Sequence, residues 1–160
     1  MYTYRVTKYN PKFRNEQGVY LKDEWTEFGD IGRSFEGKIL MEDEYLKTED
    51  AYVKVLLSFL EEGHVDSLKI DREQNFRNIK YKGEILAKGQ EYELKELEQI
   101  FRLILQGKLW CKFKNIDGSY VDFGGDYYAY IGVPERCEQS IAFAKQNELH
   151  VEEYPEPELD

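Results

Sequence analysis

The chain has few of the residues on which enzyme and metal chemistry usually depend. It contains two histidines and two cysteines among 160 residues. Metal sites need clustered ligands at defined spacing, and His64, His150, Cys111 and Cys137 form no such cluster. A cysteine nucleophile needs a neighbouring base, and none is visible beside either thiol. The sequence therefore predicts no metal site, no cofactor and no catalytic residue.

A basic surplus and a phosphate-binding motif are also missing. Lysine and arginine number 22 against 32 aspartates and glutamates, which gives a net charge of −10. The glycines of 29–32 and 124–125 lack the spacing of a phosphate-binding loop. Because a negative chain repels nucleic acids and anionic membranes, we expect neither as a partner.

Long apolar runs are missing as well. No window approaches the roughly 18 apolar residues of a membrane span. The first six residues alternate as a strand does and do not resemble a signal peptide. Two cysteines do not imply a disulfide framework. We expect a cytoplasmic protein.

Aromatic residues, by contrast, are abundant. The chain is 15% aromatic, with 13 tyrosines and nine phenylalanines, and 41% hydrophobic overall. That composition favours one packed domain over residues 1–151. Residues 152–160 combine two prolines with clustered acids, so we expect a flexible acidic tail.

The order of predicted elements indicates the fold class. Periodicity and turn residues predict strands at 2–8, 65–70, 79–81, 127–132 and 149–151, helices at 42–62, 93–106 and 134–146, and a hairpin at 109–123. Residues 10–40 read as a long irregular loop. This order predicts an α+β fold with a mainly antiparallel sheet, in which a C-terminal three-strand meander packs against about three helices.

Two helix starts depend on local interpretation. In a continuous helix over 42–62, Glu49 would project into the apolar stripe, so we expect Thr48 to cap a fresh helix start. Pro134 is expected at the first position of the third helix. Cys137 would then lie in its first turn, where amide dipoles lower the pKa of a thiol.

The hairpin register follows from sorting its faces. A two-residue turn at Asp117-Gly118 would mix polar and apolar side chains on each face. A three-residue loop with Gly118 at positive φ instead pairs Phe113 with Val121 and Lys112 with Asp122. We therefore predict the three-residue loop.

Acidic residues are concentrated in three stretches. Residues 16–30 hold five acids and one base, 41–63 seven and two, and 148–160 six and none. Large rings lie beside them in an acidic loop and on the hairpin face that we expect to point away from the core. Aromatic anchors surrounded by charge are typical of protein interfaces. We predict a partner-binding surface made of Asp23, Glu24, Trp25, Glu27, Asp30, Trp110, Tyr120, Asp122, Asp126 and Tyr128. The alternative is that Trp25 fixes only its own loop and a helix covers Trp110.

A resemblance gives this surface a specific interpretation. The segment 109–113, followed by Asp126-Tyr127-Tyr128-Ala129-Tyr130-Ile131-Gly132 and a proline-initiated helix, looks like a group of small bacterial proteins. In size, acidity and layout the chain also resembles immunity proteins of bacterial polymorphic and contact-dependent toxin systems. The resemblance implies a non-enzymatic inhibitor that binds a basic cognate toxin, often a nuclease.

Two other hypotheses remain open. The long loop over 10–40 and the many tyrosines would also suit a cytoplasmic enzyme or small-ligand protein with a pocket under that loop. Alternatively, the negative charge serves only solubility. The oligomeric state does not follow from the sequence.

Overall fold

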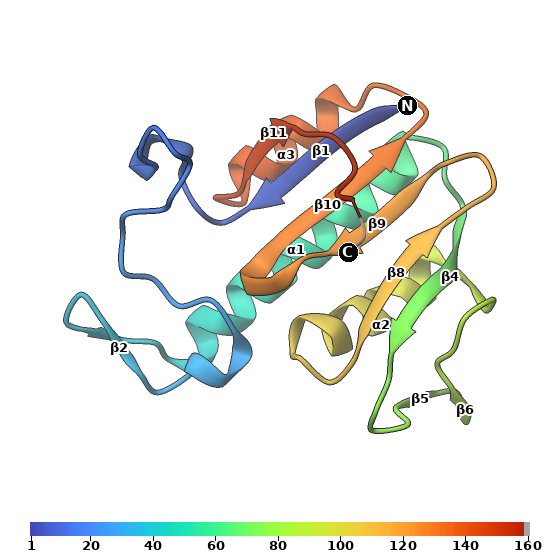
Figure 1. Ribbon diagram of the computed structural model, residues 1–160, viewed down its shortest axis with the longest axis horizontal. Helices are drawn as coiled ribbons and strands as arrows, with labels where there is room; N and C mark the ends of the chain where they lie inside the picture. The colour runs from blue at the N-terminus through green and yellow to red at the C-terminus, as the bar shows by residue number, and fades with distance from the viewer. Residues whose placement is uncertain (159–160) are drawn as a thin grey trace.

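A seven-stranded antiparallel sheet is the centre of the fold. The computed structural model describes residues 1–158. The sheet strands are β1 (Tyr2–Thr7), β4 (Ser67–Gln74), β7 (Glu91–Glu93), β8 (Trp110–Lys114), β9 (Tyr120–Phe123), β10 (Tyr128–Val133) and β11 (His150–Glu153). They lie in the order β11-β1-β10-β9-β8-β4-β7, and every neighbouring pair is antiparallel (Figure 1).

Within residues 1–158, three α-helices cover one face of this sheet. They are α1 (Glu42–Glu62), α2 (Leu94–Leu105) and α3 (Glu138–Gln146), and Figure 1 shows them behind the strands. Side chains such as Leu56, Phe101, Phe113 and Ile131 are fully buried between the two layers. This architecture confirms the predicted α+β class, and β8, β9 and β10 form the predicted meander.

Two small hairpins extend from the main sheet. One pairs β2 (Ser34–Phe35) with β3 (Lys38–Ile39), and the other pairs β5 (Lys80–Tyr81) with β6 (Glu84–Ile85). Both lie along the lower part of Figure 1. Three short 3-10 turns, Pro11–Phe13, Phe28–Asp30 and Gly125–Tyr127, complete the described elements.

The register of the β8–β9 hairpin is the predicted one. Phe113 pairs with Val121, and Lys112 pairs with Asp122. Gly118 has a φ of +95°, which a three-residue loop needs and which glycine adopts without a steric penalty. Clean sorting of polar and apolar faces was therefore sufficient to fix the pairing.

The expected break in the first helix was wrong. Helix α1 runs without interruption from Glu42, so Thr48 lies inside it and caps no helix start. Glu49 projects inward and is 1% exposed. The prediction assumed that an acid would not be buried in this stripe. A buried carboxylate is tolerated when it is paired and hydrogen-bonded, and residues of α2 provide those partners.

The third helix also begins later than predicted. Pro134 lies in a turn, and α3 starts at Glu138 with Cys137 at its N-cap position. Burial raises the pKa of the Cys137 thiol to about 11, opposite to the predicted direction, because desolvation outweighs any effect of the helix dipole.

The sheet face away from the helices is partly covered by the residues that follow β11. Tyr154 packs on Tyr130 with ring centroids 5.5 Å apart, and the Arg5 guanidinium lies 4.2 Å from the Tyr154 ring centroid. Glu156 accepts hydrogen bonds from Lys112 at 2.7 Å and from Lys114 at 2.9 Å. The segment predicted as a tail thus begins within β11 and continues with defined contacts. Its flexibility stays a prediction, and residues 159 and 160 lie outside the described part.

Replacing Gly132 by alanine tests how tightly this outer face is packed. A Cβ atom at Gly132 would lie 2.2 Å from Cε1 of Tyr120, whose side chain is 1% exposed. We expect Gly132→Ala to lower the free energy of unfolding in urea by about 1–3 kcal/mol through overpacking. Gly125→Ala is the control, because nothing lies within 4 Å of its Cβ position. Equal stability of the two variants would contradict this packing.

Stability should also depend on pH through the acids of the C-terminal segment. Hydrogen bonds from Arg14 lower the pKa of Glu152. Partial burial acts to raise the pKa of Glu156, but hydrogen bonds from Lys112 and Lys114 outweigh it and lower the pKa. Both carboxylates therefore stabilise the fold above the unfolded pKa of about 4.3, and this contribution is lost as the pH falls through the lower folded pKa. We expect the free energy of unfolding to decrease as the pH falls from about 5 to 3, and less steeply in a Glu152→Gln/Glu156→Gln variant. Identical pH profiles would refute the assignment.

Candidate functional site

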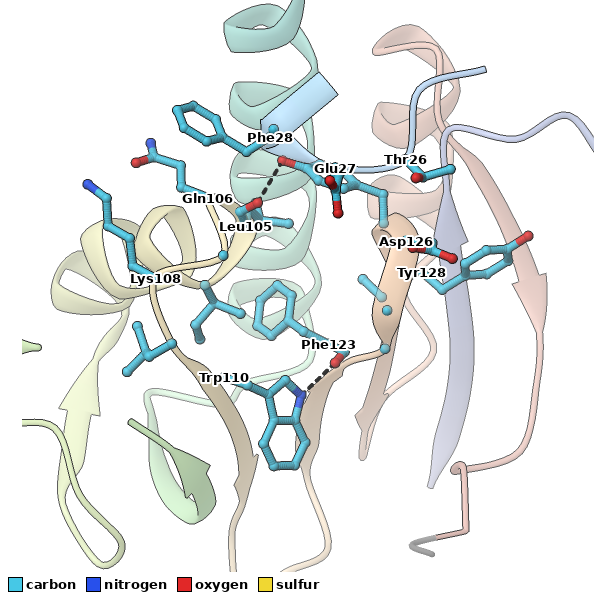
Figure 2. Close-up of a pocket in the computed structure, with 18 of the residues that line it drawn as sticks. Thr26, Glu27, Phe28, Leu105, Gln106, Lys108, Trp110, Phe123, Asp126 and Tyr128 are labelled. Atoms are coloured by element: carbon cyan, nitrogen blue, oxygen red, sulfur yellow. Dashed lines mark hydrogen bonds between the residues drawn. The ribbon is translucent and has the colours of Figure 1, made fainter. Parts of the chain in front are cut away.

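A pocket of about 740 Å³ lies at one end of the sheet. Its walls come from four parts of the chain: the acidic loop at 26–29, the segment after β4 at 74–77, the end of α2 with the following turn at 104–110, and the β9–β10 connection at 123–129. Figure 2 shows these segments converging around the pocket. A cavity of this size is in the range used for ligands and for inserted side chains of a partner.

Four of the ten predicted binding residues meet in this pocket. Glu27, Trp110, Asp126 and Tyr128 all line it, although the first is about a hundred positions away from the others. Trp110 and Tyr128 are half-buried, while Glu27 and Asp126 are exposed. The fold therefore brings predicted acids and predicted rings together at one place.

Trp110 is held in a fixed orientation. It is the first residue of β8, and its indole Nε1–H donates a hydrogen bond to the Phe123 carbonyl oxygen at 2.6 Å (Figure 2). The indole N–H is thus satisfied within the protein. The apolar surface of the ring therefore lines the pocket, while its N–H stabilises the fold. Interface tryptophans commonly combine an apolar ring face with a hydrogen-bonded N–H.

The β9–β10 connection is strained where it borders the pocket. Asp126 and Tyr127 have φ values of 60° and 66°, in the left-handed region, which aspartate adopts more readily than most residues and tyrosine seldom adopts. Two such residues in succession cost free energy that surrounding contacts must offset. Strain of this kind concentrates at binding sites, where it fixes a side chain in a position that a relaxed loop would not hold.

Contacts of Tyr127 offset this strain. Its ring packs edge-on against Trp25 and Tyr52, with centroids 5.0 and 5.1 Å away. Its single hydroxyl proton faces two acceptors, the Leu105 carbonyl oxygen at 3.1 Å and the Tyr45 hydroxyl oxygen, because Tyr45 donates its own proton to Glu49. The Tyr52 hydroxyl donates to the Tyr127 carbonyl oxygen at 2.7 Å. Burial raises the pKa of Tyr127 well above its ordinary value, so this hydroxyl stays protonated.

The buried carboxylate of Glu49 extends this network to the pocket wall. It accepts hydrogen bonds from Arg102 at 3.1 Å, Gln106 at 2.8 Å and Tyr45 at 2.9 Å. Gln106 also lines the pocket. The end of α2 and the strained connection are thus positioned by the same group of hydrogen bonds.

The pocket has walls of opposite charge. Figure 2 shows Glu27 and Asp126 on one side and Gln106 and Lys108 on the other. Arg77 adds a second positive group to the lining. Among residues 1–158, no salt bridge involves the carboxylates of Glu27 or Asp126. Both are therefore available to a cationic group.

Two further predicted acids border a smaller pocket of about 380 Å³, and Trp25 lines it as well. Asp23 and Glu24 line it from the same loop, together with the buried Lys8 side chain. Lys8 donates to Glu24 at 3.1 Å and lies 4.2 Å from the Trp25 ring centroid. Burial lowers the pKa of Lys8, although Glu24 opposes that change. Glu24 thus neutralises a buried lysine, and Asp23 remains exposed.

The remaining predicted residues are buried, which corrects their assignment as an exposed surface. Trp25 is 8% exposed because its ring packs on Tyr45 and Tyr127, so the alternative of a loop-fixing tryptophan describes it better. Asp30 is 5% exposed, and its carboxylate accepts the Thr26 N–H at 2.9 Å.

Tyr120 and Asp122 lie away from the pocket. They are 1% and 6% exposed, beneath the C-terminal segment on the outer sheet face. Tyr120 pairs with Lys114 near the hairpin turn, whereas Trp110 lies at the opposite end of β8, so the two predicted rings are far apart along the strand. Sequence alternation identified the face of these residues but not what covers it.

Some pocket residues had no clear signal in the sequence. Phe76 is 89% exposed and lines the pocket beside Arg77. An isolated phenylalanine in a polar stretch was the one available hint. Lys108 and Gln106 follow the apolar stripe of α2 and read as ordinary helix-end residues, so only the tertiary structure places them at a site.

The two thiols lie in the interior of the protein. Both cysteines are buried and free, and burial raises the pKa of Cys111 to about 12. Among the described residues, no group of three or more His, Cys, Asp or Glu side chains is arranged to hold a metal ion. None of the helices in residues 1–158 has the length and apolar content to cross a bilayer.

No known protein family, curated protein or solved structure matches this chain.

Removing one hydroxyl should show that Tyr127 secures the strained connection. We expect Tyr127→Phe to lower the free energy of unfolding by about 1–3 kcal/mol, because the Leu105 carbonyl and the Tyr45 hydroxyl both lose a partner in the interior. Tyr128→Phe is the matched control, since its ring is half-buried and its hydroxyl has no hydrogen-bond partner among residues 1–158. Chemical denaturation followed by tryptophan fluorescence measures both variants. A loss for Tyr128→Phe as large as that for Tyr127→Phe would contradict the anchoring role.

Proposed function

We propose that the chain is a non-enzymatic inhibitor of the immunity-protein type, which binds a basic toxin through the end-of-sheet pocket and the acidic loop beside it. One observation carries the proposal: the carboxylates of Glu27 and Asp126 line the same pocket as Trp110 and Tyr128, and neither acid is engaged in an ion pair inside the described chain. This arrangement suits a lysine or arginine side chain of a partner.

The expected contact combines two interactions. A cation that enters between the acids would lie against aromatic surface, where cation–π attraction contributes about 0.5–2 kcal/mol. The acids add direct electrostatic attraction, which is stronger in a partly enclosed site than on an open surface. Because the strained connection already holds Asp126 in place, binding does not have to order it.

Exposed acids near the pocket support fast association. Asp23 and Glu27 belong to the acidic loop, and Glu42, Asp43 and Glu44 form the exposed first turn of α1. Fields from such clusters raise the association rate of a basic partner. The basic wall of Lys108 and Arg77 makes the site selective, because a partner must present its cation to the acid side.

A small-ligand function is the second candidate. The pocket volume and its oppositely charged walls would also suit a zwitterionic small molecule. Only residues 26–29 of the 10–40 loop line this pocket, whereas the smaller pocket is bordered by residues 23–25 and by several of residues 35–40 of that loop.

Co-expression tests the inhibitor function directly. The gene directly upstream should encode the toxin, and its product expressed alone should stop growth of a bacterial host. We expect co-expression of this chain to restore growth. We expect Glu27→Gln/Asp126→Asn to weaken binding of the purified toxin at least tenfold, since two charged contacts of about 0.7 kcal/mol each are lost.

Two controls make the result specific. Glu84→Gln removes an exposed acid on the β5–β6 hairpin and should leave the affinity unchanged. Asparagine tolerates positive φ, so Asp126→Asn should keep the fold, which the thermal unfolding midpoint checks. Affinity should fall as salt concentration rises. Absence of growth rescue, or affinity indifferent to both the double substitution and salt, would refute the proposal and leave solubility or a small ligand as the explanation.

A further inference from the structure

A lysine on the outer face of the sheet is buried together with its charge. The Lys112 side chain is 2% exposed and lies in the middle of β8. Burying an ammonium group is unfavourable unless an anion pairs with it. The Glu156 carboxylate provides that anion at 2.7 Å and also accepts from Lys114 at 2.9 Å. The two lysines therefore form a built carboxylate site.

The occupant of this site is held weakly by its main chain. The Tyr154 N–H donates to the Thr3 carbonyl oxygen at 3.1 Å. Beyond it, residues 155–158 make no main-chain hydrogen bond within the described chain, and the polar contacts come from the Glu156 side chain. Proline at 155 and 157 removes two donors that could join a sheet. Side-chain chemistry, and not strand pairing, keeps this segment on the sheet.

The charge of the site favours an anion from any source. Asp122 lies 4.0 Å from Lys112 and offsets part of the positive charge, so two lysines and one aspartate leave a positive site before Glu156 arrives. The Tyr120 ring centroid lies 5.7 Å from the Lys112 ammonium and 6.0 Å from that of Lys114.

The Tyr120 hydroxyl is unsatisfied. It is buried without a hydrogen-bond partner among residues 1–158. Burial raises the pKa of Tyr120, so the hydroxyl stays protonated. A buried donor left without a partner costs about 1–3 kcal/mol. No hydrogen bond joins the Tyr120 hydroxyl to Glu156 in the described chain, although its ring lies beside both lysines.

We propose that Lys112, Lys114 and Tyr120 form a binding site for acidic peptide segments, and that the chain's own residues 154–156 are its resident occupant. An acidic segment of a partner protein enters when the resident segment leaves. The aromatic part of the site, Arg5 with Tyr130, accepts a ring one or two residues before the acid, as it now accepts Tyr154. The two lysines of this site lie further along β8 than Trp110, and Arg5 lies between the site and the pocket, 4.2 Å from the Tyr154 ring centroid and 5.4 Å from that of Tyr128. The proposal does not rest on toxin binding.

Competition by the resident segment sets the expected affinities. A tethered group acts at an effective concentration of about a millimolar or more, so an external peptide binds the unmodified chain poorly. Removing the Glu156 charge should release the site. The probe is an acetylated and amidated peptide with the sequence of residues 153–157, Glu-Tyr-Pro-Glu-Pro, titrated into the full-length chain and followed by two-dimensional amide NMR.

We expect Glu156→Gln to bind this peptide at least tenfold more tightly than the unmodified chain, with shifts at Lys112, Lys114 and Tyr120. A peptide carrying glutamine at the position of Glu156 should bind the same variant at least tenfold more weakly. Glu158→Gln is the matched control, because this acid is exposed and has no ion-pair partner in residues 1–158, and it should behave as the unmodified chain.

A second substitution locates the contact. Lys114 is partly exposed, so Lys114→Gln combined with Glu156→Gln should fold and should lose most of the gained peptide affinity. The proposal is overturned if the folded Glu156→Gln variant does not bind the peptide. It is also overturned if that variant binds no more tightly than the unmodified chain, or if the loss of Lys114 has no effect.

Discussion

The need to satisfy one buried carboxylate organises much of this structure. Glu49 is placed in the interior by a helix whose apolar stripe it interrupts, and a charge there is tolerated only with close partners. Arg102 and Gln106 come from α2 to meet it, so the two helices are joined by charge as well as by packing. Through Tyr45 the same group reaches Tyr127 and holds the connection that borders the pocket. The pocket geometry is thus linked to Glu49, which does not line the pocket but bonds to Gln106 in its wall.

The acidic surplus has two different uses in the molecule. Glu24, Glu152 and Glu156 neutralise lysines and arginines that are largely buried, so they contribute to folding and little to the external field. Asp23, Glu27 and Asp126 remain exposed near the pocket. Counting charges along a sequence overstates the field that a partner meets, because ion pairs formed on folding remove part of it.

The sequence was sufficient for the fold class and for much of the pairing. Alternation in the 109–123 segment fixed the hairpin register, since a shift by one residue would expose Phe113 and bury its charged neighbours on the core side. Glu49 was misread because its partners lie about fifty residues further along, and local rules do not contain them. Trp25 and Tyr120 were predicted as exposed for the same reason: burial depends on which distant segment covers a side chain. The acidic and aromatic residues of the pocket were predicted from the clustering of acids beside large rings. Lys108 and Gln106 could be assigned to the pocket only from the tertiary structure.

The position of β1 in the sheet has a consequence for how the chain matures in the cell. Its two neighbours are β10 and β11, so Tyr2 pairs with Val133 and Tyr4 with Glu153. A ribosome delivers the first strand long before either neighbour exists, and pairing between chain ends is slow because of the loop that must close. Completion of the sheet therefore awaits synthesis of β10 and β11. Until then its apolar N-terminal strand depends on collapse against helix α1, or on chaperones, to avoid aggregation.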